Sequence, residues 1–207
     1  MKGNEIEAES FRIIEEEAGD HGLDERHWPI VRRMIHTSAD FEYIHTARFH
    51  PDAVEKGIRA IQRGEMIITD TAMAMAGIRK KTAERFGCRV ECLISRPDVV
   101  QTARENDRTR AEAAVDTAVE SVDSGIFVVG NAPTALMRIL ELVRRGRAAP
   151  SLILGFPVGF VNAAESKESL LFVDVPFITN AGRKGGSNIA AAVVNALLIT
   201  AEERKGT

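Results

Sequence analysis

Residues 126–145 read IFVVGNAPTALMRILELVRR, and their pattern indicates the type of fold that most of the chain adopts. The segment opens with an apolar run rich in β-branched residues, 126–130, which is typical of a buried strand. A short turn follows, in which Pro133 suits the first position of a helix. Over 133–145 the apolar residues recur at helical spacing. The segment therefore predicts a strand, a loop and a helix in succession.

The same unit recurs on both sides of this segment. Further apolar runs stand at MIITD (66–70), RVECLI (89–94), SLILG (151–155) and PFIT (176–179), and further helical patterns at 108–122, 162–171 and 187–203. Their hydrophobicity is continuous rather than alternating, which is typical of strands that are buried on both faces of a parallel sheet. We therefore expect an α/β fold, a single three-layer α/β/α domain with a mostly parallel sheet of about five strands.

The first 65 residues lack such runs and are expected to be helical. Helical spacing of apolar residues runs from Ile6 to Ile14, a second helix is expected from Asp24, as N-cap, to about Ile35, and a third over 51–64. This helical N-terminal section (1–65) is expected to pack on the α/β core (66–207). At 207 residues the chain is long enough for one domain, 1–207, and short for two.

Composition and charge limit the classes of partner. A net charge of -3 and a pI near 6.0 give no reason to expect a nucleic-acid partner. The N-terminus is acidic and amphipathic, unlike a secretory signal, and no apolar run approaches the roughly 20 residues of a membrane span. We therefore expect a cytoplasmic protein that binds neither nucleic acid nor membrane.

The two cysteines, Cys88 and Cys92, are expected to be free thiols. They stand four apart in a stretch that is predicted to be a strand, which places them roughly 13 Å from each other. That separation is too large for a disulfide. A metal-binding pair is disfavoured because no second Cys/His pair has the spacing of a structural zinc site.

The loops that follow the strand runs are the expected ligand site, because sheets of this kind bind ligands beyond the carboxyl ends of their strands. Asp70 and Thr71 follow the first strand, and the loops 130–134, 155–162 and 180–187 follow three others. Glycine lets the backbone approach a ligand closely, and helix N-termini attract anions. These loops therefore fit a large ligand with several negative groups, although each one alone also fits a tight turn.

Basic residues lie near the same loops. Arg183 and Lys184 add positive charge to the last loop, with a solvated basic pair as the alternative. Arg108, Thr109 and Arg110 open the helix at 108–122, where arginines oppose the helix dipole and so indicate an external anion. Pairing of these arginines with neighbouring acidic residues is the alternative. A nucleotide site is disfavoured, because the chain has neither GxxxxGK[ST] nor a GxGxxG after its first strand run.

All five histidines lie in the N-terminal section, and His36 differs from the others by its position. It ends an apolar-periodic helix shortly after Arg32 and Arg33, from where it can project into a cleft. The histidine spacings match no standard zinc site and HExxH is absent, so the remaining histidines are expected to be surface or core residues. No GxSxG motif marks a nucleophile. His36 is therefore the candidate acid–base residue.

Seven segments spread over nearly the whole chain share the motif order of one known family. They are ESFRII (9–14), RRMIH (32–36), ITDTAMAMAGI (68–78), RTRAEAA (108–114), GNAPTAL (130–136), GFPVGFVNAAESK (155–167) and VPFITNAGRKGGSNIAAAVVNAL (175–197). In these segments the chain resembles the precorrin-8X methylmutase family, including the cobalt-precorrin-8 form of the anaerobic pathway. The resemblance implies an isomerase of vitamin B12 biosynthesis that moves a methyl group from C11 to C12 of the corrin macrocycle to give (hydrogeno)cobyrinic acid.

The resemblance also implies roles for particular residues. The histidine of RRMIH maps onto His36, which would protonate the ring system and take the proton back without a nucleophile or cofactor. Cobalt enters only as part of the substrate, and no protein metal site is expected. The substrate-binding residues implied are Ser10, Arg33, Asp70, Thr109, Arg110, Asn131, Thr134, Asn162 and Ser187. The family is dimeric, so a homodimer is expected.

The substrate of that family is a large, mostly apolar ring edged with carboxylates. The apolar residues expected to face the ring are Met73, Val158, Phe160 and Val161. Whether His45 and His50 matter for a cobalt-containing substrate is left open by the sequence. We expect the chain to belong to the cobalt-early branch. Two other classes remain as alternatives, a tetrapyrrole carrier with the same pocket but no chemistry and a nucleotide-dependent transferase.

Overall fold

The computed structural model describes residues 3–122 and 124–205, and within these ranges it contains a six-stranded sheet in the order β1-β6-β5-β4-β2-β3. Strands β2, β3, β4, β5 and β6 run parallel to one another, and β1 pairs antiparallel with β6 at one edge. The strands are β1 (Ala47–Phe49), β2 (Ile67–Thr69), β3 (Val90–Glu91), β4 (Ile126–Val129), β5 (Leu152–Gly155) and β6 (Phe177–Asn180). The mostly parallel α/β sheet is confirmed.

The first strand corrects the expectation of a purely helical N-terminal section and raises the strand count to six. β1 pairs Ala47 with Asn180 and Phe49 with Ile178. It has only three residues, and only Ala47 among them is buried. A segment this short, at a sheet edge, has no apolar run to mark it. Its pairing depends on β6, which lies about 130 residues later in the chain.

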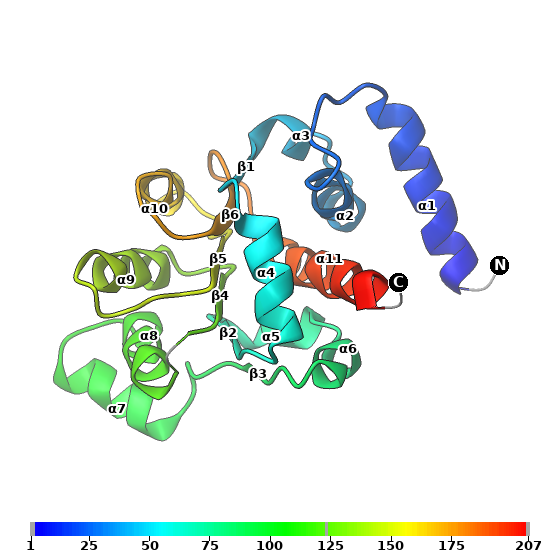
Figure 1. Cartoon of the computed structure of the whole chain (residues 1–207). Coiled ribbons are helices and arrows are strands. Elements are labelled where there is room, and N and C mark those ends of the chain that lie inside the picture. The colour runs from blue at the N-terminus through cyan, green and yellow to red at the C-terminus, as the bar shows by residue number, and fades with distance from the viewer. Residues whose placement is uncertain (1–2, 123, 206–207) are drawn as a thin grey trace.

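Helices cover both faces of the sheet, as Figure 1 shows. On one side lie α7 (Pro97–Glu105), α8 (Arg110–Ser121), α9 (Pro133–Arg144) and α10 (Ala163–Leu170). On the other side lie α2 (Trp28–Ser38), α3 (Tyr43–Thr46), α4 (Ala53–Gln62), α5 (Ala72–Gly77), α6 (Lys80–Arg85) and α11 (Ser187–Lys205). Helix α1 (Gly3–Ala18) packs on the outside of α2. The three-layer arrangement follows from this distribution.

Alternate residues of one strand enter the two different layers of the core. In β4, Ile126 and Val128 belong to the apolar cluster under α2, α4 and α11, whereas Phe127 and Val129 belong to the cluster under α8 and α9. All four are buried. Both faces of the strand are therefore apolar, which explains the continuous run in the sequence.

The helix boundaries differ from expectation mainly in the N-terminal section. Asp24 was expected to cap the second helix, but α2 begins at Trp28. Instead, the carboxylate of Asp24 accepts the backbone N–H of Arg26 and forms an ion pair with the guanidinium of Arg26. These two contacts stabilise a turn before the helix. Pro29, inside the first turn of α2, fits this later start. None of the helices that the structure describes has the length and apolarity needed to span a bilayer.

Candidate active site

The parallel strands β2, β4, β5 and β6 end at the same edge of the sheet, which we call the carboxyl edge. Asp70 follows β2 there and is 7% exposed. Its carboxylate accepts the backbone N–H groups of Gly130, Asn131 and Ala132, each at 2.8 Å. Burial raises the pKa of Asp70, and the three N–H donors act in the opposite direction. The carboxylate therefore shapes the loop that follows β4.

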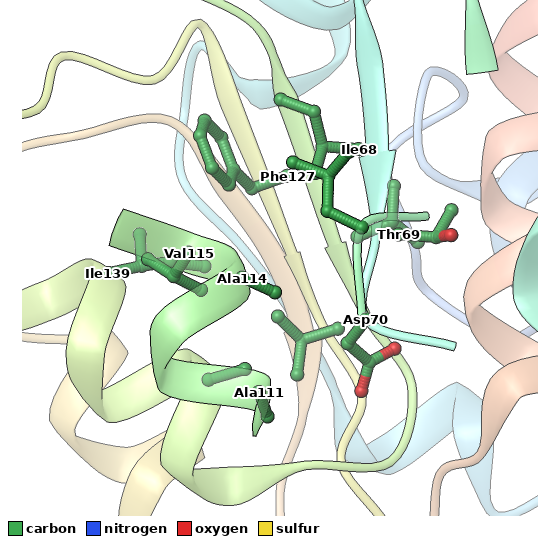
Figure 2. A pocket seen from close by; sticks show the side chains of 12 residues that line it. Ile68, Thr69, Asp70, Ala111, Ala114, Val115, Phe127 and Ile139 are labelled. Atoms are coloured by element: carbon green, nitrogen blue, oxygen red, sulfur yellow. The ribbon is translucent and has the colours of Figure 1, made fainter. Parts of the chain in front are cut away.

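A small cavity lies beneath this loop, between the sheet and α8. Figure 2 shows Ile68 and Phe127 of the sheet, Ala114 and Val115 of α8, and Asp70 among the side chains that line it. Its volume is about 20 Å³, which is enough for about one water molecule. A macrocycle cannot enter it. A large ligand at the carboxyl edge would therefore have to lie on its surface.

The start of α11 is joined to the end of β2. The hydroxyl oxygens of Thr71 and Ser187 lie 2.7 Å apart, and Thr71 also caps α5 by accepting the N–H of Ala74 at 3.1 Å. Ser187 is 7% exposed. Its contact with Thr71 brings two loops far apart in sequence to one place on the carboxyl edge. Sequence reasoning placed both Thr71 and Ser187 in loops at this edge, but it did not foresee the contact between them, which joins segments 116 residues apart.

Thr109 and Thr134 come together at the neighbouring part of the edge. Their hydroxyl oxygens lie 3.1 Å apart, although the residues belong to different helices. Thr109 caps α8 in a capping box with Glu112. Arg110, the first residue of α8, is exposed at the same end of the helix. The expected anion-binding residues Thr109, Arg110 and Thr134 therefore lie together.

The loops that follow β5 and β6 form one connected surface. Gly159 donates its N–H to Arg183 O at 3.2 Å, and Gly186 donates its N–H to Phe156 O at 2.8 Å. Asn162 has a left-handed backbone, with φ 59°, directly before α10. The loop before it presents exposed apolar side chains to solvent, namely Val158, Phe160 and Val161. Met73 is exposed as well, so all four side chains expected to face the ring are accessible.

A buried lysine joins α10 to the loop after β6, and sequence reasoning missed it. Lys167, on α10, is 1% exposed, and its Nζ donates to Lys184 O at 2.6 Å. The side chain of Lys184 points elsewhere, since it pairs with Asp40 and Glu42, each at 2.6 Å. Lys184 therefore connects the loop to the N-terminal section instead of adding free charge to the rim.

The buried ammonium of Lys167 predicts a pH-dependent stability. Burial lowers the pKa of Lys167 from 10.5 to about 8. Between these values the unfolded chain keeps a proton that the folded chain has lost, so the contribution of Lys167 to stability rises with pH across this window. The size of this rise is about 3 kcal/mol. We expect Lys167→Met to lack it when urea unfolding is measured below pH 8 and again near pH 10.5.

The exposed Lys81 supplies the matched control, because Lys81→Met removes an ammonium that is not buried. This variant is expected to keep the wild-type rise in stability. A rise of the same size in wild type and Lys167→Met would contradict the assignment of the rise to Lys167.

His36 lies in a second place, a hollow of about 200 Å³ between α2, α5 and α11. The hollow is lined by His36 and Thr37 of α2, Gly77 of α5, and Asn188, Ala191 and Asn195 of α11, among others. Because α11 starts at Ser187, this hollow adjoins the carboxyl edge. We call it the His36 hollow. Sequence reasoning missed its polar lining on α11, because the two asparagines stand inside an apolar helical pattern.

Arg33 and Ser10 lie at the junction of α1 and α2. Arg33 lines the His36 hollow, and its guanidinium pairs with Glu7 of α1 at 3.0 Å. Ser10 donates its hydroxyl to Ile6 O, within its own helix, at 2.9 Å. Both residues therefore lie on the His36 side of the molecule, and Arg33 already has a carboxylate partner.

Three of the other histidines pack on aromatic rings. His21 stacks on Trp28 and His27 on Phe49, with ring centroids 3.9 and 4.0 Å apart, and His50 meets the edge of Phe177. These contacts agree with the expectation that these histidines are surface or core residues. Within residues 3–122 and 124–205, no three His, Cys, Asp or Glu side chains gather as metal ligands. Cys88 and Cys92 are free, as expected.

The geometry gives the carboxyl edge two complementary parts. One part holds exposed apolar side chains, helix N-termini and Arg110, which suit an apolar ligand with carboxylates. The other part, the His36 hollow, holds an exposed imidazole that can give or take a proton. Such an arrangement can bind a large anionic ring and exchange one proton with it.

Comparisons with known proteins agree with this description. A family model described as precorrin-8X methylmutase matches residues 5–200. A cobalt-precorrin-8 methylmutase of Priestia megaterium is 46% identical over 202 residues, covering 98% of this chain and 90% of the relative. A precorrin-8X methylmutase of Pseudomonas aeruginosa is 39% identical over 197 residues, covering 94% of each. The crystal structure of a precorrin-8X methyl mutase from Thermus thermophilus superimposes with a TM-score of 0.91 at 48% identity, over 98% of each chain.

Proposed function

Because the chain belongs to the precorrin-8X methylmutase family, we propose that it moves a methyl group from C11 to C12 of (cobalt-)precorrin-8, with His36 as proton donor and acceptor. The protein is a methylmutase, an intramolecular methyl-transferring isomerase of cobalamin biosynthesis, and its substrate is a tetrapyrrole precursor. The observation that supports the role of His36 is its exposed position in a hollow at the carboxyl edge.

The proposed step is balanced within one substrate molecule. His36, in its protonated form, gives a proton to the ring system. The C11–methyl bond breaks as the C12–methyl bond forms, and the bonding electron pair migrates with the methyl group. The proton then returns to the imidazole, so the enzyme ends in the state in which it began. We propose that no cofactor takes part, and that cobalt, where present, belongs to the substrate.

The carboxyl edge suits the substrate by its chemistry. The exposed side chains of Phe160 and Val161 offer apolar surface to the ring, and Arg110 offers a positive charge to a ring carboxylate. We propose the remaining contacts at Ser10, Arg33, Thr109, Asn131, Thr134, Asn162 and Ser187. Asp70 accepts the N–H groups of residues 130–132, so we propose that it acts in substrate binding by holding this loop in shape.

Two further proposals concern the cobalt content of the substrate and the oligomeric state of the protein. We propose a cobalt-containing substrate, supported by relatives named cobalt-precorrin-8 methylmutase, among them the Priestia megaterium enzyme at 46% identity. We further propose a cytoplasmic homodimer. The exposed Phe172 and Leu171 beside α10 are apolar surface that a partner subunit can cover.

Catalysis is tested by product formation in excess over protein. With substrate in large excess, we expect the corrin absorbance to rise far beyond one equivalent per chain for both cobalt-containing and cobalt-free precorrin-8, and faster with cobalt. A rise that stops at one equivalent would instead indicate a tetrapyrrole carrier. A faster rate without cobalt would contradict the proposed substrate and leave the methylmutase activity intact.

A further inference from the structure

Helix α1 places one aromatic ring against His36. The centroids of the Phe11 and His36 rings lie 4.9 Å apart, with the ring planes tilted by 41°. The same phenyl ring meets two arginines of α2, since the guanidinium carbon of Arg32 lies 4.6 Å and that of Arg33 5.0 Å from its centroid. One half-buried phenylalanine therefore contacts His36, Arg32 and Arg33 of the neighbouring helix.

The imidazole of His36 has little else to fix its orientation. His36 stands exposed in the last turn of α2, where its side chain can turn freely into solvent. Among the residues that the structure describes, the ring of His36 has no hydrogen-bond partner, and Phe11 is its aromatic contact. A catalytic group contributes fully only when it is held near the reacting atom. Phe11 is placed to supply that restraint.

Phe11 is itself held in place by contacts around it. Glu7 pairs with Arg33 at 3.0 Å, one turn before Phe11. Glu15, one turn after it, accepts the indole N–H of Trp28 at 2.9 Å and also pairs with Arg32. These contacts fix α1 on α2 on both sides of Phe11. The phenyl ring therefore forms a rigid wall beside the imidazole.

We propose that Phe11 is a positioning residue that orients the imidazole of His36 for proton transfer. The inference rests on the proposed role of His36. Phe11 acts through packing and takes no part in the proton transfer itself. Its removal is expected to lower kcat more than it raises KM, because Phe11 packs on the imidazole itself, whereas most of the proposed substrate contacts lie on elements other than α1 and α2.

The test compares two substitutions of Phe11 with a control at a similar contact. Phe11→Leu keeps an apolar side chain but removes the ring, and Phe11→Tyr keeps the ring. Phe49→Leu is the control, because Phe49 stacks on His27 at 4.0 Å outside the His36 hollow. We expect kcat to fall about 10-fold or more in Phe11→Leu, with a smaller change in KM. Phe11→Tyr and Phe49→Leu are expected to keep kcat within about twofold of wild type.

Nuclear magnetic resonance gives a second readout that does not depend on turnover. The ring proton signals of His36 carry the ring-current shift of Phe11, so they are expected to move in Phe11→Leu and to stay near their wild-type positions in Phe49→Leu. Wild-type kcat in Phe11→Leu, or equal losses in Phe11→Leu and Phe49→Leu, would overturn the inference. Full turnover by His36→Asn would instead overturn the proposed role of His36, so the two failures are distinguishable.

Discussion

Replacing His36 with asparagine is expected to lower kcat by about 10²–10⁴-fold, the usual contribution of a general acid–base group. The amide side chain is polar and of similar reach, but it cannot hold a proton to give to the ring. His36 is exposed, so its replacement opens no cavity in the core. We therefore expect the free energy of unfolding to change little. Initial rates of corrin formation and urea unfolding measure the two effects.

The control for this substitution is His45→Asn. His45 is an exposed histidine on α3, outside the lining of the His36 hollow. Its replacement is expected to leave kcat within about twofold of wild type, since no proton transfer is assigned to it. A His36→Asn variant that turns over like wild type, or a loss of equal size in His45→Asn, would remove His36 from the mechanism.

Replacing Gly130 with alanine is expected to lower the free energy of unfolding by about 1–3 kcal/mol, the typical effect of overpacking. A Cβ atom on Gly130 would lie 2.6 Å from the Cα and 2.9 Å from the N of Ser187, both of which are backbone atoms. The loop after β4 and the start of α11 must therefore move apart. We also expect KM to rise, because both segments belong to the proposed binding surface.

Gly3→Ala is the matched control, because a Cβ atom on Gly3 would meet nothing within 4 Å. Urea unfolding of the two variants separates a steric effect at Gly130 from the general effect of adding a methyl group to glycine. Equal stabilities for the two variants would show that the close approach of Gly130 and Ser187 does not constrain this part of the fold.

The parts of the fold that the sequence predicts are those whose signal is local. β4 and β5 have four buried residues each, so their apolar runs mark them without knowledge of any partner. α9 follows such a run and has apolar residues at helical spacing. α11 follows another such run and is a long helix of 19 residues. β1 lacks a local signal, since its three residues pair with a strand near the other end of the chain.

The candidate site divides in the same way. Gly, Ser, Thr and Asn in the loops after the strands are visible in the sequence, because parallel strands bring their carboxyl ends together. The bonds of Asp70 to the loop at 130–132 and of Lys167 to Lys184 O join distant segments, and no local pattern announces them. The contact of Phe11 with His36 likewise depends on how α1 packs on α2. Tertiary packing, rather than residue type, decides which polar groups remain available to a ligand.

A crystal structure of the protein with its corrin product bound tests the central claim most directly. We expect the ring to lie on the carboxyl edge, against Phe160 and Val161, with its C11–C12 side toward the His36 hollow. An imidazole nitrogen of His36 is then expected about 3–3.5 Å from the ring, the separation of a near-attack geometry. A ring bound away from the carboxyl edge, or one that leaves His36 facing solvent, would contradict the account.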